Sequence, residues 1–182
     1  MTIAGVAEEK IELPSGVKAT IEDDVITISA KGSKLSRELW HPRVKLTVSG
    51  NAVVIRSELP SRREKALVGT FASHVRNMIT GVIVGFRCEL KMVYSHFPMK
   101  LLVKDRDFII ENFLGEKFPR KAKIMGDYQV EVKGDQVFVS GQSIEDVGQT
   151  AANIERATKI KNFDPRVFQD GVYIVVKPGE AK

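Results

Sequence analysis

The stretch VKLTVSGNAVVI, residues 44–55, decides the fold class of this chain. Apolar and polar residues alternate over positions 44–48, and a run rich in β-branched residues occupies positions 52–55. Between them stand Gly50 and Asn51, two residues that favour the positive φ angles of tight turns. Because a period of two is typical of a strand with one buried face, the stretch predicts an antiparallel hairpin.

The same pattern returns as YQVEVKGDQVFV, residues 128–139, 84 positions further along the chain. An apolar stripe with helical spacing follows each hairpin, and Val147 of the second stripe stands 79 positions after Val68 of the first. Gly81–Val84 also resembles Gly171–Ile174, 90 positions on, which predicts a glycine-led strand after each helix and a second copy eleven residues longer there. The matched order indicates a tandem duplication.

Each copy is expected to be α+β, a small antiparallel sheet with one face covered by one helix. The predicted domains are residues 1–82 and 83–182, with the boundary near Gly81–Gly85. Ser61 is expected to cap the first helix, with Glu64 completing a capping box, and Ser143 the second.

Composition excludes several classes of protein. The 182 residues include 43% hydrophobic and 28% charged residues, a balance too apolar for a disordered chain. A single cysteine, Cys88, excludes an internal disulfide and favours a reducing cytosol. The longest apolar run, residues 78–86, is far shorter than the roughly 18 residues of a membrane span, so no membrane partner is expected. The net charge of +5 fits a polyanionic partner such as nucleic acid.

The sequence offers no catalytic constellation and no cofactor motif. Its three histidines, His41, His74 and His96, stand at no metal-ligand spacing, so we expect no metal site. Cys88 and His96 are the one conceivable nucleophile and base, but a lone thiol in an alternating apolar segment is usually a buried core residue. We therefore expect a protein that is not an enzyme.

Clusters of lysine and arginine are the features that point to a function. Such side chains bind phosphates by charge, although most charge clusters are simply solvated surface. The second copy's extra loop is favoured because binding residues concentrate on loops. The first-rank candidates for RNA binding are Arg156, Lys159, Lys161, Arg166 and Lys177, followed by Lys117, Arg120, Lys121 and Lys123. Asn153 and Thr150 are expected to donate to phosphate or ribose from the second helix.

The stretch VGQTAANI, residues 147–154, resembles the C-terminal signature of the large-subunit ribosomal protein six family. The resemblance covers nearly the whole chain, and RVFQDGVY, residues 166–173, is similar to the archaeal and eukaryotic branch. The Tyr-Lys-Gly-Lys-Gly segment of the bacterial branch is absent from the sequence, so the bacterial lysine contacts are not carried over. The short length indicates an archaeal member.

The resemblance implies two homologous α+β domains and a structural role in the large subunit of the cytoplasmic ribosome. It also implies binding of ribosomal RNA near the stalk base and next to the sarcin-ricin loop. Neighbouring ribosomal proteins at the stalk base would be partners, with translation factors nearby. The competing hypothesis is a protein-interaction module that uses open sheet faces, whose binding would respond little to salt.

Overall fold

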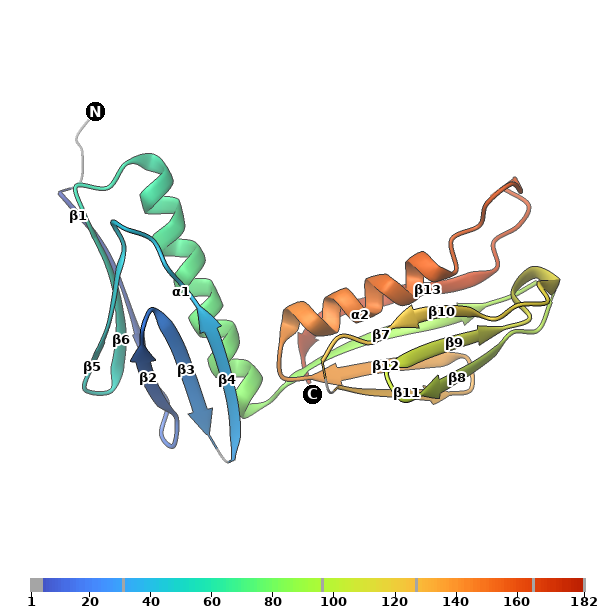
Figure 1. Cartoon of the computed structure of the whole chain (residues 1–182), viewed down its shortest axis with the longest axis horizontal. Coiled ribbons are helices and arrows are strands. Elements are labelled where there is room, and N and C mark those ends of the chain that lie inside the picture. Colours follow the sequence, from blue (N-terminus) through green and yellow to red (C-terminus); the bar gives the residue numbers. More distant parts are fainter. Residues whose placement is uncertain (1–4, 31, 96, 127, 165, 182) are drawn as a thin grey trace. The chain divides into compact units, whose positions relative to one another are not determined.

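The computed structural model describes residues 5–30, 32–95, 97–126, 128–164 and 166–181. The chain divides into two compact units, Met1–Ile83 and Val84–Lys182 (Figure 1). His96, expected to be structural or solvated, lies outside the described residues. Each unit has its own hydrophobic core, so each can be followed from its sequence separately.

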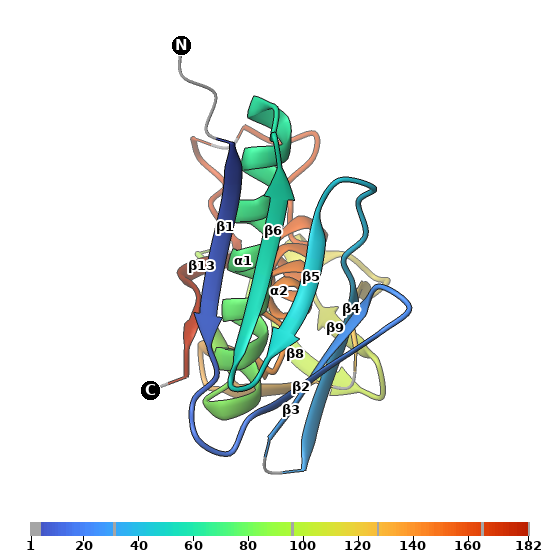
Figure 2. The same ribbon diagram turned by 90° about the vertical axis from the view of Figure 1, so that its left-hand side faces the viewer.

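The first unit contains two antiparallel sheets of three strands, in the orders β1-β6-β5 and β2-β3-β4. The elements are β1 (Val6–Glu12), β2 (Lys18–Glu22), β3 (Val25–Ala30), β4 (Ser33–Glu38), β5 (Lys45–Ser49), β6 (Ala52–Glu58) and α1 (Arg62–Ile83). The hairpin predicted for residues 44–55 is confirmed: Ser49 pairs with Ala52, and Gly50 turns the chain at φ 58°. Figure 2 shows β1 and β6 lying over α1, with β5 beside β6.

Helix α1 buries its apolar stripe in the core of the first unit. Val68, Ala72 and Val75 pack in one cluster with Ile28 of β3 and Val53 of β6. The helix begins with the predicted capping box. Glu64 accepts a hydrogen bond from the Ser61 amide at 2.6 Å, and the Ser61 hydroxyl accepts one from the Glu64 amide at 3.3 Å. These reciprocal bonds satisfy amides that have no partner inside the helix.

The second unit contains a four-stranded sheet, in the order β11-β12-β7-β13, and a three-stranded sheet, in the order β10-β9-β8. The elements are β7 (Phe86–Val93), β8 (Lys100–Lys104), β9 (Asp107–Glu111), the 3-10 turn Phe113–Gly115, β10 (Arg120–Lys123), β11 (Gln129–Lys133), β12 (Gln136–Gly141), α2 (Ile144–Ala157) and β13 (Gly171–Glu180). Val147, Ala151 and Ile154 of α2 are fully buried in this unit's core.

The two units repeat one plan, as the sequence predicts, since a hairpin followed by a helix occurs in each. The structure adds a second small sheet to each unit. One predicted strand is wrong: Gly81, Val82 and Ile83 are the last residues of α1 rather than the start of a strand. A short apolar run fits either state, and here the stripe of Met78, Ile79 and Val82 continues the buried face of the helix.

The strand that follows α1 is β7, and it lies in the four-stranded sheet of the second unit. Neither helix in the described part of the chain combines the length and the apolar character needed to cross a membrane.

Candidate functional site

Helix α2 lies along β10, one of the two edge strands of the three-stranded sheet (Figure 1). Three hydrogen bonds join α2 to β10 and to the residues just after β10. The Met125 amide donates to the Thr150 hydroxyl at 3.0 Å, and the Asn153 amide nitrogen Nδ2 donates to the Lys123 carbonyl at 3.0 Å. Nη1 of Arg120 donates to the Ala157 carbonyl at 2.8 Å. These bonds fix the groove between α2 and β10.

Arg120 holds the end of α2 in place. Besides Ala157, its Nη1 donates to the Lys159 carbonyl at 3.1 Å, and its Nε donates to Glu116 at 2.8 Å. Its guanidinium lies 4.1 Å from the centre of the Phe113 ring, and its side chain is only 22% exposed. Hydrogen bonding to Arg120 lowers the pKa of Glu116. These partners occupy most of the N–H donors of Arg120, so we leave it out of the proposed RNA contact, and its predicted role stays a prediction.

Thr150, predicted to donate to RNA, is not accessible in this structure. Its side chain is 0% exposed, and its hydroxyl is bonded to the Met125 amide. Asn153 is partly exposed. Its Nδ2 donates to the Lys123 carbonyl, while its Oδ1 accepts from Gln149 at 2.8 Å. Asn153 therefore keeps only part of its capacity to donate hydrogen bonds to RNA.

Three exposed cations of the predicted first and second ranks meet over the groove. Lys121, Lys123 and Arg156 line one open hollow of about 600 Å³, together with Gln149 and Asn153. Lys121 and Lys123 face outward because they alternate with buried Ala122 on β10. Arg156 also lines a second hollow, which it shares with Lys159. We call Lys121, Lys123, Arg156 and Lys159 the seam cluster.

Other predicted cations lie on nearby loops. Lys161 and Arg166 are exposed on the segment between α2 and β13, and Lys117 is exposed just before β10. The loop is ordered by Asp164, whose side chain accepts from the Arg166 amide at 2.9 Å and whose carbonyl accepts from the Phe168 amide at 3.0 Å.

Lys177 is exposed but does not join the seam cluster. The end of α2 meets the start of β13, where the Val172 amide donates to the Thr158 hydroxyl at 3.0 Å. Lys177 stands further along β13, roughly 15 Å from Val172 at the usual rise per residue of a strand. The next residue, Pro178, packs near Gly148 in the first half of α2. Lys177 therefore belongs to another part of the surface.

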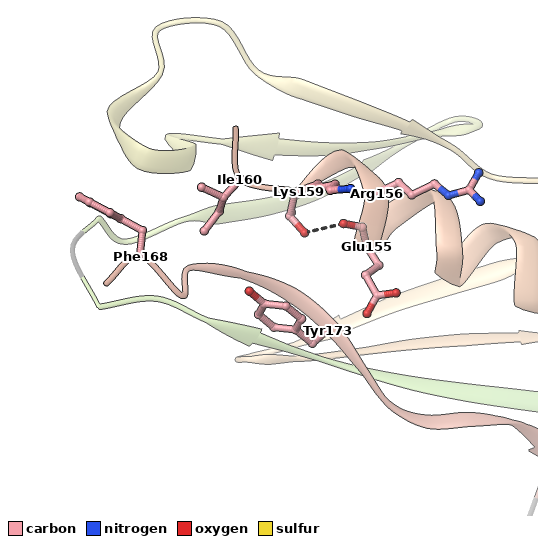
Figure 3. A pocket seen from close by; sticks show the side chains of 7 residues that line it. Glu155, Arg156, Lys159, Ile160, Phe168 and Tyr173 are labelled. Carbon is pink, nitrogen blue, oxygen red and sulfur yellow. Dashed lines mark hydrogen bonds between the residues drawn. The ribbon is translucent and has the colours of Figure 1, made fainter. Parts of the chain in front are cut away.

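The second hollow measures about 430 Å³ and lies where the end of α2 faces the start of β13 (Figure 3). Glu155, Arg156, Thr158, Lys159, Ile160, Phe168 and Tyr173 line it. Ile160, Phe168 and Tyr173 were absent from the sequence prediction, as was Gln149 of the first hollow. The aromatic residues at the end of the extra loop could have indicated this hollow from the sequence, because aromatic side chains beside cations are typical of RNA-binding surfaces.

Cys88 does not have the properties of a nucleophile. It is 0% exposed, and its Sγ donates to the Val176 carbonyl at 3.2 Å. Burial, with smaller contributions from Glu155 and Glu89, raises the pKa of the Cys88 thiol to about 11. The reactive thiolate is therefore scarce at neutral pH. Within the described residues, no three His, Cys, Asp or Glu side chains gather as a metal site would require.

Comparison with known proteins places this chain in a family. The family model described as Ribosomal protein L6 matches residues 13–85 and 97–171. The large ribosomal subunit protein uL6 of Methanosarcina mazei is 51% identical over 92% of this chain and 95% of its own length. The uL6 protein of Archaeoglobus fulgidus is 50% identical over 98% of this chain and 94% of its own. The uL6 protein of Methanococcus vannielii is 46% identical over 99% of both chains.

Each matched range lies largely within one structural unit, and all three of these relatives are archaeal proteins. The chain therefore belongs to the ribosomal protein L6 family, whose members are structural, non-enzymatic components of the ribosome.

Proposed function

We propose that the chain binds ribosomal RNA of the large subunit through its second unit, near the stalk base and the sarcin-ricin loop, and stabilises the folded RNA there. The observation that carries the proposal is the seam cluster. Four exposed cations from β10, α2 and the segment just after α2 line two hollows that share Arg156, and side-chain hydrogen bonds hold α2 against β10. Phosphate contacts of this kind position a protein on RNA.

The acidic residues near the seam cluster offset only part of its charge. Glu116 is paired with Arg120. Glu155 accepts a hydrogen bond from the Ile174 amide at 3.3 Å, and its carboxylate faces β13 rather than β10. The charge that β10 and the end of α2 present together is therefore positive.

Lys117, Lys161, Arg166 and Asn153 extend the proposed contact beyond the seam cluster, and Lys177 would touch a separate RNA segment. The position near the stalk base and the sarcin-ricin loop rests on the family resemblance. So do the neighbouring ribosomal proteins and nearby translation factors as partners.

The test compares two matched quadruple variants in binding to large-subunit ribosomal RNA. One changes Lys121, Lys123, Arg156 and Lys159 to Gln, and the control changes the exposed Lys10, Lys18, Lys34 and Lys45 of the first unit to Gln. Both remove four positive charges. We expect the seam variant alone to lose at least about tenfold in affinity and to flatten the salt dependence by about three in the log–log slope.

Equal losses in the two variants would show that total charge, rather than this surface, drives binding. If the affinity of the unmodified chain did not change with salt concentration, the protein-interaction module would be favoured instead.

A further inference from the structure

The hollow lined by Phe168 and Tyr173 has a shape and chemistry that phosphate binding alone does not require. Its volume of about 430 Å³ falls in the range of pockets that hold small ligands. Figure 3 shows the Glu155 carboxylate and the Tyr173 ring near each other, with Ile160 and Phe168 farther toward the loop. Apolar and aromatic walls with a few polar groups are typical of a site for a flat organic group.

The walls of this hollow are held by bonds of their own, so it exists before any ligand arrives. The Thr158 hydroxyl accepts from the Val172 amide at 3.0 Å, which fixes the end of α2 against β13. The Tyr173 hydroxyl donates to the Gln169 carbonyl at 3.2 Å, which ties the ring to the loop. The Phe163 and Phe168 rings pack 4.8 Å apart.

We propose that this hollow, here called the Tyr173 hollow, receives one unstacked base of the bound RNA. The inference rests on the proposed function and goes further, since it names the chemical group that is recognised. A base would stack on Phe168 or Tyr173, while Arg156 and Lys159 at the rim would hold its phosphates.

The polar group in the wall favours particular bases. Glu155 already accepts from the Ile174 amide, and a carboxylate can accept several hydrogen bonds. It can therefore also accept from the exocyclic amino group of adenine, cytosine or guanine. Uracil has no exocyclic amino group and offers only its ring N3–H. An apolar side chain of a neighbouring protein is the other occupant to consider, but it would gain nothing from the two cations at the rim or from the carboxylate.

The experiment uses the full chain with large-subunit ribosomal RNA and two matched variants. Phe168→Leu and Phe163→Leu both remove the same ring pair, but only Phe168 lines the hollow. We expect Phe168→Leu to weaken binding about tenfold, which is typical of losing one stacked base. Phe163→Leu should stay close to the unmodified chain. The salt slope should be unchanged in both variants, because neither loses a phosphate contact.

Ultraviolet cross-linking followed by mass spectrometry supplies a direct readout. A nucleotide adduct on Phe168 or Tyr173 is the expected result. If Phe168→Leu fails to fold, Tyr173→Leu and Tyr173→Phe replace the pair: the first should weaken binding, and the second, which keeps the ring, should restore it.

The outcomes separate the two proposals. If the unmodified chain does not bind the RNA, the proposed function fails and this inference with it. If the chain binds and the seam variant is weakened, but Phe168→Leu matches Phe163→Leu and neither ring carries an adduct, the Tyr173 hollow holds no base and the proposed function stands. A cross-link from Tyr173 to a protein in intact large subunits would also overturn the inference.

Discussion

Thr150 and Arg156 lie on the same helix, yet only one of them can reach a partner molecule. Thr150 is 0% exposed, and its hydroxyl is bonded to a backbone amide. Arg156 is exposed, and it lines both hollows of the second unit. A buried polar group must be bonded within the protein, because leaving it unpaired costs about 1–3 kcal/mol. At the scale of the residue, burial therefore decides which polar side chains remain available for RNA.

Cys88 provides a test at this scale. Because burial raises its pKa to about 11, we expect the folded protein to resist iodoacetamide at pH 7.5. The same thiol should react readily once the protein is unfolded in urea, where its pKa returns toward the ordinary value. Mass spectrometry of the alkylated chain measures both rates. Fast labelling of the folded protein would contradict the buried assignment and revive the nucleophile hypothesis.

At the scale of the elements, the contact between α2 and β10 depends on Arg120. We expect Arg120→Met to lower the free energy of unfolding by about 2–3 kcal/mol, since it leaves the Ala157 and Lys159 carbonyls without a charged donor. Urea denaturation measures this change. Stability should also become less sensitive to acid, because Glu116 would lose the partner that lowers its pKa.

The neighbouring residue on β10 supplies the control for this prediction. Lys121→Met changes an exposed side chain, so its effect on stability should stay within about 0.5 kcal/mol. The same substitution should measurably weaken RNA binding, because Lys121 belongs to the seam cluster. If the two variants were equally stable, Arg120 would not hold the end of α2 in place as described above.

Local chemistry explains which elements could be predicted. Turn residues such as Gly50 and cap residues such as Ser143 act within a few positions of the chain, and both predictions are confirmed. The strand predicted at Gly81 failed because a short apolar run fits either state. The role of Arg120 depends on carbonyls 37 and 39 positions away, which no local pattern shows. The Tyr173 hollow was missed because it needs α2, the loop and β13 together.

At the scale of the whole molecule, each unit has a separate core. We therefore expect a chain of residues 84–182 to fold alone and to bind large-subunit ribosomal RNA within about threefold of the full chain, a difference below about 1 kcal/mol. Circular dichroism and a binding titration measure the two properties. An unfolded fragment, or one that binds far more weakly, would show that residues 1–83 are needed for the site.

The position of β7 has a consequence for how the protein is made. This strand leaves the synthesising ribosome directly after α1, but its place is inside the four-stranded sheet, between β12 and β13. Since elements emerge from the N-terminus first, the first unit can fold while the second still waits for β13. Until β13 is made, one edge of β7 is unpaired, and unpaired sheet edges are prone to aggregation. Tyr173 also belongs to β13, so the nascent chain completes its proposed RNA-binding hollow only after nearly all of its core has been translated.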